Sequence, residues 1–171
     1  MKWTCVFPGQ GWQALGMGTW LYQNFPTAQR TFQEASDALK IDLKKLCFES
    51  SEAELALTHN TQPALLCVST ATQRVLLETY QIPVSYTAGH SIGEYAALVL
   101  ADVLDFSMAM KAVRVRGEAM QAAVPVGQGG MVATLGLNEE QVLALCTWGE
   151  QGSGHKPVQP ANFNCPGQIV I

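Results

Sequence analysis

A serine between two glycines is the part of this sequence with the clearest chemical potential. Residues 89–93 read Gly-His-Ser-Ile-Gly, after a strand-like run at 84–87 and before an apolar, helix-like run at 96–100. A Gly-x-Ser-x-Gly pattern in this context predicts a nucleophile elbow, a sharp turn that exposes the hydroxyl of Ser91. The glycines remove side chains that would collide in such a turn. The amide of Ile92 would then lie where an oxyanion develops during acyl transfer.

A second candidate site element is the glycine-containing loop around Gln10. Residues 3–7 are predicted to form a short buried strand, which ends at Pro8. Gly9 and Gly11 carry no side chains, so the amides around Gln10 could approach a bound group closely. An ordinary tight turn is the alternative interpretation.

Arg116 is the most informative cation in the sequence. It falls in a predicted helix, 106–122, for which Asp105 is the expected cap. Helical periodicity places Arg116 on one face with Ala109, Ala112, Val113 and Met120, and Arg114 on another face with Lys111, Glu118 and Gln121. Arg116 is therefore expected to point inward and Arg114 outward. A guanidinium on an apolar face requires a carboxylate partner. That partner could be an acidic substrate or an internal residue such as Glu94, and the periodicity does not separate the two.

The order of predicted elements indicates an α/β fold with a parallel sheet. Between the strands at 3–7 and 84–87 we expect a helix over 26–39 and a helix that begins with a capping box at 51–54. We also expect a long helix that runs to about Tyr80, capped by Thr61 and with Pro63 in its first turn. Strands joined through helices form parallel sheets with right-handed crossovers. Residues 1–124 are therefore expected to form one domain.

From residue 125 the pattern of predicted elements changes. A glycine-rich joint at 127–130 precedes a small predicted βαββ unit. Its expected elements are a strand over 131–135, a helix over 139–148 capped by Asn138, and strands over 158–162 and 168–171. Residues 125–171 are therefore expected to form a second, partial domain.

Composition limits the classes of partner. The chain has 171 residues, is 48% hydrophobic and carries a formal net charge of -4. Because it has no long basic run, it is not expected to bind nucleic acid or an anionic membrane. The apolar part of the N-terminus is too short for a secretory signal, so a cytoplasmic location is expected. The five cysteines are widely spaced without a Cys-x-x-Cys pair, which favours free, mostly buried thiols and no metal site.

Five ordered motifs together resemble the malonyl-CoA:acyl-carrier-protein transacylases over essentially the whole chain. They are Phe-Pro-Gly-Gln-Gly at 7–11, Thr-Gln-Pro-Ala-Leu at 61–65, Gly-His-Ser-Ile-Gly-Glu-Tyr at 89–95, Arg-Gly at 116–117 and Asn-Phe-Asn-Cys-Pro-Gly-Gln at 162–168. The resemblance implies an α/β-hydrolase-like core with a partial ferredoxin-like subdomain. It also implies that malonyl-CoA is the substrate, that acyl carrier protein is the partner, and that no cofactor is permanently bound. The pathway would be fatty-acid or polyketide synthesis.

The resemblance also assigns roles to individual residues. Ser91 would be the acylated nucleophile, the amides of Gln10 and Ile92 would form the oxyanion hole, and Arg116 would bind the malonyl carboxylate. Three further residues would line the pocket, namely His90, Gln62 and Asn162.

One catalytic residue of the family has no counterpart in this sequence. Relatives carry a catalytic histidine in a segment that would begin after Ile171, so we expect the chain to be the N-terminal part of a transacylase. His59, His90 and His155 are poor candidates for the general base. Two alternatives therefore remain open: a serine hydrolase or thioesterase that uses water as acceptor, and a catalytically inactive module that only binds the carrier protein.

Overall fold

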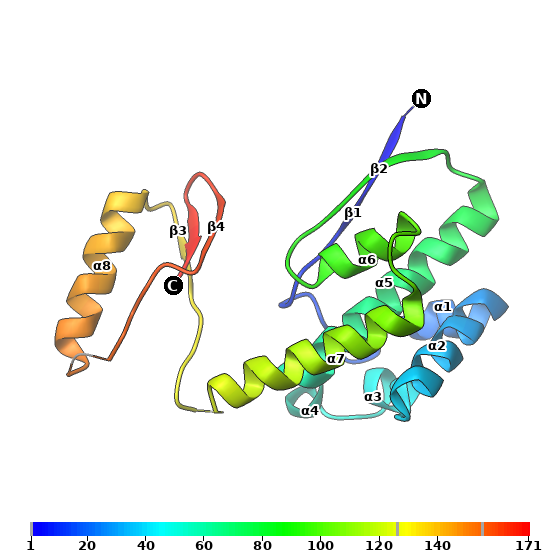
Figure 1. Cartoon of the computed structure of the whole chain (residues 1–171), viewed down its shortest axis with the longest axis horizontal. Coiled ribbons are helices and arrows are strands. Elements are labelled where there is room, and N and C mark those ends of the chain that lie inside the picture. The colour runs from blue at the N-terminus through cyan, green and yellow to red at the C-terminus, as the bar shows by residue number, and fades with distance from the viewer. Residues whose placement is uncertain (1, 126, 155) are drawn as a thin grey trace. The chain divides into compact units, whose positions relative to one another are not determined.

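The structure is a computed structural model that describes residues 2–125, 127–154 and 156–171. It contains two compact units, Met1–Val124 and Pro125–Ile171 (Figure 1), which are described in turn. No helix in the described part of the chain is long and apolar enough to cross a membrane.

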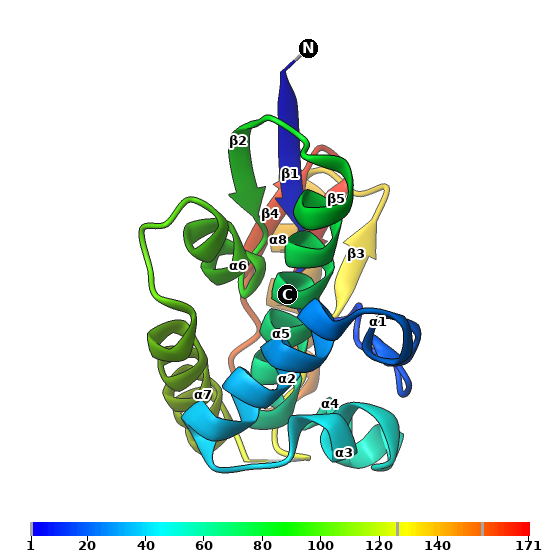
Figure 2. The same ribbon diagram turned by 90° about the vertical axis from the view of Figure 1, so that its right-hand side faces the viewer.

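The first unit contains a parallel pair of strands, β1 (Trp3–Phe7) and β2 (Val84–Gly89). Figure 2 shows the two strands side by side and pointing the same way. This mixed helix and strand arrangement, with parallel pairing, confirms the predicted α/β class. The prediction that β1 is buried was wrong, because only Phe7 is buried and the rest of the strand is half-buried or exposed.

Seven helices complete the described part of the first unit. They are α1 (Thr19–Asn24), α2 (Pro26–Leu39), α3 (Leu43–Phe48), α4 (Glu52–Ala56), α5 (Thr58–Tyr80), α6 (Gly93–Leu100) and α7 (Phe106–Ala123). The predicted caps of α4 and α7 are confirmed: Ser51 accepts a hydrogen bond from the amide of Glu54, and Asp105 accepts one from Met108. These caps set where both helices begin.

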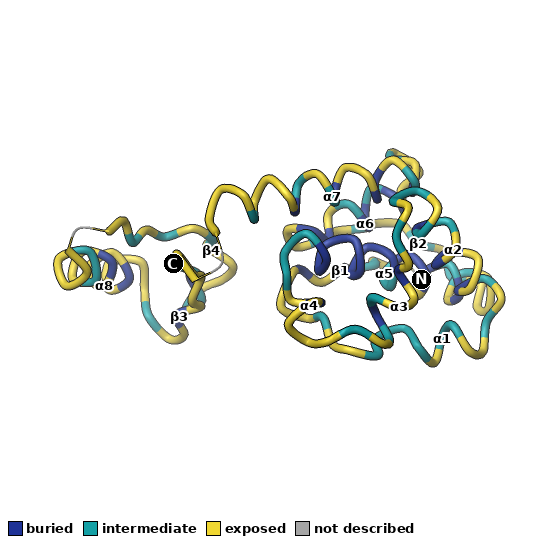
Figure 3. The backbone as a smooth tube through the Cα atoms, turned by 90° about the horizontal axis from the view of Figure 1, so that it is seen from below, coloured by how far each residue is buried: buried dark blue, intermediate teal, exposed yellow. Residues whose placement is uncertain are grey.

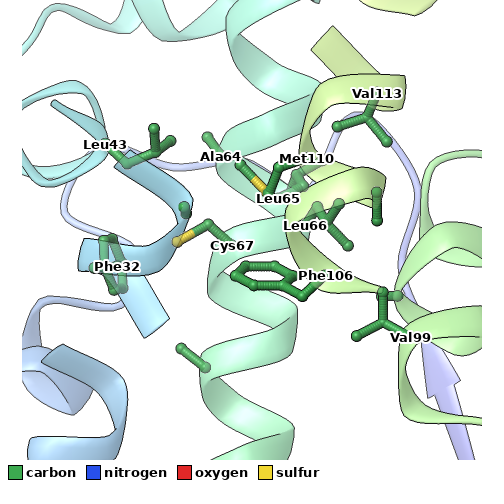
Figure 4. Close-up of a cluster of buried hydrophobic side chains, with 14 of the residues drawn as sticks. Phe32, Leu43, Ala64, Leu65, Leu66, Cys67, Val99, Phe106, Met110 and Val113 are labelled. Carbon is green, nitrogen blue, oxygen red and sulfur yellow. The ribbon is translucent and has the colours of Figure 1, made fainter. Parts of the chain in front are cut away.

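The hydrophobic core of this unit is built around α5, between α2 and α7 (Figure 4). Much of the buried part of the chain lies in α5, where residues 60–67 are all buried (Figure 3). The largest apolar side chains of the core include Phe32, Leu43, Leu66, Met110 and Val113. The core therefore holds α5 and α7 against each other, and these two helices carry Gln62 and Arg116.

The start of α5 differs from the prediction. Thr61 was expected to cap the helix, but α5 begins at Thr58, and Thr61 lies inside it with its hydroxyl donating to the carbonyl of Leu55 over 2.6 Å. Pro63 is consequently inside the helix rather than in its first turn. An internal proline leaves a helical carbonyl without its amide donor, and that carbonyl finds another partner near the site described below.

The second unit pairs a helix with a small antiparallel sheet. Its elements are β3 (Ala133–Leu135), α8 (Glu139–Gly152), β4 (Asn162–Cys165) and β5 (Gln168–Val170), with β5 in the centre of the sheet. Asn138 and Gln141 form a full capping box at the start of α8. The strand predicted over 158–162 begins instead at Asn162, since Pro157 and Pro160 have no amide hydrogen to donate to a sheet.

All five thiols are free, and Cys47, Cys67 and Cys146 are buried. Burial raises the pKa of the Cys47 thiol to about 12. It also raises the pKa of Cys67 well above its usual value, with the nearby Cys47 adding to the effect. Because the thiolate is the reactive form, these two cysteines are unsuited to be nucleophiles at neutral pH.

Candidate active site

The predicted nucleophile elbow is present between β2 and α6. Ser91 has a φ of 53°, in the left-handed region that a residue with a side chain seldom adopts. Two tight turns hold it there, in which Gly93 donates to the carbonyl of His90 over 2.9 Å and Glu94 donates to that of Ser91 over 3.1 Å. The amide of His90 donates to the carbonyl of Phe7 over 3.0 Å, which ties the elbow to the end of β1. The side chain of Ser91 is exposed at the tip of this strained turn.

Both glycines of the motif are required by close backbone contacts. A Cβ atom on Gly89 would lie 2.0 Å from the carbonyl carbon of Gly93, and a Cβ atom on Gly93 would lie 2.4 Å from the carbonyl oxygen of Phe7. The atoms in the way belong to backbone, so they cannot move aside as a flexible side chain would. The two glycines therefore allow β1, β2 and α6 to meet behind the serine.

Gly93→Ala is expected to destabilise the first unit strongly. The added methyl group would separate α6 from the end of β1, and overpacking against backbone lowers the free energy of unfolding by about 3 kcal/mol or more. Thermal and urea unfolding would measure this loss. Gly130→Ala is the matched control, because nothing lies within 4 Å of a Cβ atom at Gly130. Equal unfolding midpoints for the two variants would contradict the assigned role of Gly93.

A chain of hydrogen bonds connects the serine to the interior. The Nη2 atom of Arg116 donates to Ser91 Oγ over 3.2 Å, and its Nη1 atom donates to Gln62 Oε1 over 2.7 Å. Ser91, Arg116 and Gln62 come from the elbow, α7 and α5, so tertiary structure brings them together. This places the guanidinium of Arg116 directly beside the hydroxyl of Ser91.

Arg116 has no carboxylate partner among the described residues. The ion pairs found there join Arg74 to Glu34 and Arg114 to Glu118, and none includes Arg116 or Glu94. Arg116 is half-buried, so part of its guanidinium remains accessible. Helical periodicity left two partners for Arg116 open, an internal carboxylate and an acidic ligand. The described structure contains no salt bridge between Arg116 and an internal carboxylate, so the acidic ligand remains the candidate partner.

Gln62 is completely buried, in contrast to its expected position at a helix entrance. Its Nε2 atom donates to the sulfur of Met120 over 3.2 Å, while its Oε1 atom accepts from Arg116. A buried amide held at both ends has little rotational freedom. Gln62 therefore orients the guanidinium of Arg116.

Arg114 was expected to point outward, but it also contacts α5. Its Nε atom does pair with Glu118, at 2.6 Å, while its Nη1 atom donates to the carbonyl of His59 and to Asn60 Oδ1, both at 3.0 Å. The carbonyl of His59 is the one that Pro63, four residues later, leaves without an amide donor. Arg114 thus compensates for the proline in the turn of α5 that carries Gln62.

The close approach of α7 to α5 was also not predicted from the sequence. A Cβ atom on Gly117 would lie 2.7 Å from the Cα atom of His59, so the two helices touch at this glycine. The sequence feature that indicates this approach is the Arg-Gly pair at 116–117. The glycine lets α7 approach α5, and the preceding arginine is thereby brought near Gln62.

The loop after β1 packs directly on the elbow. A Cβ atom on Gly9 would lie 2.5 Å from His90 Nδ1 and 3.0 Å from the carbonyl oxygen of His90, so a side chain at this position would displace that ring or the loop. Gln10 is exposed, and its side chain lies 3.5 Å from Thr58 Oγ1. Among the residues that the structure describes, neither the amide of Gln10 nor that of Ile92 donates a hydrogen bond to the protein. Both amides could therefore donate to a ligand oxygen.

The remaining candidates fall into two groups. His90 is exposed beside Gly9, and His59 is half-buried in the first turn of α5, whereas His155 lies outside the described residues. Asn162 is half-buried at the start of β4, opposite Val170, in the second unit. Its relation to Ser91 therefore stays a prediction.

Comparison with known proteins identifies the family. The acyl transferase domain family matches residues 4–170. The chain belongs to this family. It is 50% identical over 169 residues to a malonyl CoA-acyl carrier protein transacylase of Bacillus subtilis (strain 168), covering 97% of this chain and 51% of the relative. It is 45% identical over 166 residues to the protein of that name from Escherichia coli (strain K12), covering 97% and 53%.

Solved structures of acyl transferases give the same picture. A malonyl-transacylase in complex with a type II polyketide synthase acyl carrier protein matches with a TM-score of 0.89 and 47% identity, over 99% of this chain and 54% of that one. An acyl carrier protein S-malonyltransferase from Vibrio cholerae matches with a TM-score of 0.84 and 45% identity, over 98% and 54%. The chain thus spans about half the length of the acyl transferase domain proteins it matches.

Proposed function

We propose that this chain is the nucleophile-bearing part of a malonyl-CoA:acyl-carrier-protein transacylase. In this proposal, residues 1–124 belong to an α/β-hydrolase-like core and residues 125–171 to a partial ferredoxin-like subdomain. The observation that carries the proposal is the position of Arg116, a half-buried cation within 3.2 Å of the serine hydroxyl and without a carboxylate partner among the described residues. Such a site suits an acyl group that bears its own carboxylate, as malonyl does.

The reaction would proceed through two displacements at Ser91. The serine oxygen attacks the thioester carbon of malonyl-CoA, an oxygen–carbon bond forms, the carbon–sulfur bond breaks, and coenzyme A leaves as the thiol. The phosphopantetheine thiol of the carrier protein then attacks the resulting ester. The malonyl group moves to that sulfur and the serine regains its proton. Covalent catalysis suits this exchange, because two similar thioesters are connected through one ester.

The oxyanion of each tetrahedral intermediate would be bound by the amides of Gln10 and Ile92. Support comes from their lack of protein acceptors in the described structure and from the contact between the Gly9 loop and the elbow. Ile92 immediately precedes α6, so the positive end of the helix dipole adds to the stabilisation. Loss of one such donor typically lowers kcat by about 100-fold or more.

Proton transfer requires a group other than Arg116. Arg116 donates to Ser91 Oγ, and a guanidinium has N–H donors but no acceptor, so it cannot take the hydroxyl proton. We infer that the general base is the histidine that the family carries in the part of the fold beyond the match to this chain. His90 and Asn162 would line the acyl pocket.

Intact mass spectrometry after addition of malonyl-CoA tests the proposal. The chain is examined alone and co-expressed with the part of the Bacillus subtilis relative that it does not match. A gain of one malonyl group, located on Ser91 by peptide mapping, is the expected result in the co-expressed preparation. Absence of the adduct from both preparations would refute the proposal. Release of free malonate without carrier protein would instead identify a hydrolase.

Gln62→Leu is expected to raise KM for malonyl-CoA about tenfold with a smaller change in kcat, because a hydrogen bond to a charged group contributes about 1.5–3 kcal/mol. Arg116 would lose the acceptor that orients it. Steady-state kinetics in the preparation that forms the adduct would measure the change. Gln33→Leu, at an exposed glutamine of α2, is the control. An unchanged KM in Gln62→Leu would contradict the positioning role.

A further inference from the structure

A second arginine of α7 holds the turn of α5 that carries Gln62. The Nη1 atom of Arg114 donates to the carbonyl of His59 and to Asn60 Oδ1, both over 3.0 Å. Its Nε atom donates to Glu118 over 2.6 Å, which holds the planar guanidinium from its other side. Only 27% of the Arg114 side chain is exposed. The arginine is therefore anchored to its own helix and to α5 at the same time.

The bond to the carbonyl of His59 replaces one that the helix cannot make. In an α-helix this carbonyl would accept from the amide four residues later, but Pro63 has no amide hydrogen. Asn60 is buried, and its Oδ1 atom accepts from the same nitrogen of Arg114. Two acceptors in adjacent residues of α5 would therefore lose this donor if Arg114 were removed. Unsatisfied acceptors favour local opening of the turn to water.

The same turn carries the residue that orients the site arginine. Gln62 is completely buried, and its Oε1 atom accepts from Arg116 over 2.7 Å. Arg116 also donates to the serine of the elbow over 3.2 Å. A Cβ atom on Gly117 would lie 2.7 Å from the Cα atom of His59, so α5 and α7 are in contact at this turn. The direction of the Arg116 guanidinium therefore depends on the turn that Arg114 holds.

We propose that Arg114 is a positioning residue for the carboxylate site. It fixes the turn of α5 that carries Gln62, and through Gln62 it fixes the direction of Arg116. Among the described residues its hydrogen bonds go to α5 and Glu118, so it acts through other residues rather than on the substrate. The inference rests on the proposed function, because it takes Arg116 as the group that binds the malonyl carboxylate. Arg114 would then favour a carboxylated acyl group without contacting it.

Arg114→Ala is expected to raise KM for malonyl-CoA about fivefold while acetyl transfer changes little, because a residue one step removed from a binding group usually has a moderate effect on affinity. Arg114→Lys keeps a cation that can donate to one carbonyl, but it lacks the planar fork and should recover only part of the loss. Steady-state kinetics with both thioesters, in the preparation that forms the malonyl adduct, measures these changes.

Arg74→Ala is the matched control. The Arg74 side chain is 33% exposed and pairs with Glu34 over 2.7 Å, much as Arg114 pairs with Glu118, but it joins α5 to α2. Its removal should lower the unfolding midpoint to a similar extent and leave KM for malonyl-CoA unchanged. A purely structural role for Arg114 would give the two variants the same kinetics, and that result would overturn the proposal.

Pro63→Ala tests the physical reason for the role of Arg114. Alanine restores the amide that donates to the carbonyl of His59 in a regular helix, so the turn becomes less dependent on Arg114. In the Pro63→Ala background, Arg114→Ala should therefore raise KM only about twofold. The same fivefold increase in both backgrounds would contradict the proposal.

The side-chain amide of Gln62 gives a readout that does not depend on activity. Its NH₂ signals are measured by NMR in the full chain and identified by their absence in Gln62→Leu. A buried amide that is bonded at both ends should exchange its hydrogens slowly with water. We expect Arg114→Ala to accelerate this exchange about tenfold or more, and Arg74→Ala to leave it unchanged.

Two results of the exchange measurement would overturn the proposal. They are exchange that Arg114→Ala leaves unchanged, and equal acceleration in Arg114→Ala and Arg74→Ala. If the wild-type preparation transferred no malonyl group, the exchange rates would still decide whether Arg114 positions Gln62. Only the proposed activity would then be refuted.

Discussion

Ser91→Ala is expected to abolish malonyl transfer, with a loss in kcat of at least about 10⁴-fold, as for removal of other serine nucleophiles. The hydroxyl is the atom that the elbow exposes, and Arg116 donates to it over 3.2 Å. The malonyl adduct should disappear from the mass spectrum, and carrier-protein malonylation should fall with it. A Ser91→Ala variant that still forms the adduct would show that another residue is acylated.

Ser91→Gly separates the chemistry from folding. Because Ser91 has a φ of 53°, glycine relieves strain there that alanine retains, and we expect Ser91→Gly to be more stable than Ser91→Ala by about 1 kcal/mol. Both variants should be inactive. Urea unfolding of the two variants measures the difference. If alanine proved the more stable, the left-handed conformation of the elbow would be in question.

Arg116→Ala is expected to lower kcat/KM for malonyl-CoA about 100-fold, while transfer of an acetyl group changes little. A charge-assisted hydrogen bond contributes about 1.5–3 kcal/mol, and each 1.36 kcal/mol corresponds to a factor of ten. The loss should be selective, because acetyl has no carboxylate for the guanidinium to bind. Competition between the two thioesters in one reaction gives the ratio directly.

Two further variants control for charge and geometry. Lys111→Ala removes an exposed positive charge from the same helix and should leave both activities unchanged. Arg116→Lys keeps the charge without the planar fork and should recover only part of the malonyl activity. Equal losses of malonyl and acetyl transfer in Arg116→Ala would exclude a carboxylate-binding role.

Local sequence was sufficient to locate the elbow and the ends of several elements. The Gly-x-Ser-x-Gly pattern predicted the turn between β2 and α6, and the capping residues Ser51, Asp105 and Asn138 predicted where α4, α7 and α8 begin. Each of these features depends on contacts between residues only a few positions apart. Such contacts are encoded in a short stretch of chain, so they can be recognised without the rest of the fold.

Local rules failed where a distant segment supplied the missing interaction. The start of α5 was placed at Thr61 because Pro63 resembled a residue of the first turn. The helix begins three residues earlier, at Thr58, and Arg114, 55 positions from His59, donates to the carbonyl that Pro63 leaves without an amide donor. The burial of β1 was overestimated for a similar reason, since an apolar strand does not reveal which of its faces is covered.

The sequence by itself determined the candidate nucleophile Ser91, the class of fold and the family resemblance, because these depend on short motifs in a fixed order. Only the tertiary structure decided that Arg116 meets Ser91 rather than Glu94, and that a buried Gln62 orients it. Those contacts join α5, the elbow and α7 across 25 to 54 positions. Helical periodicity fixes the face on which a side chain lies, but only packing fixes what that face meets.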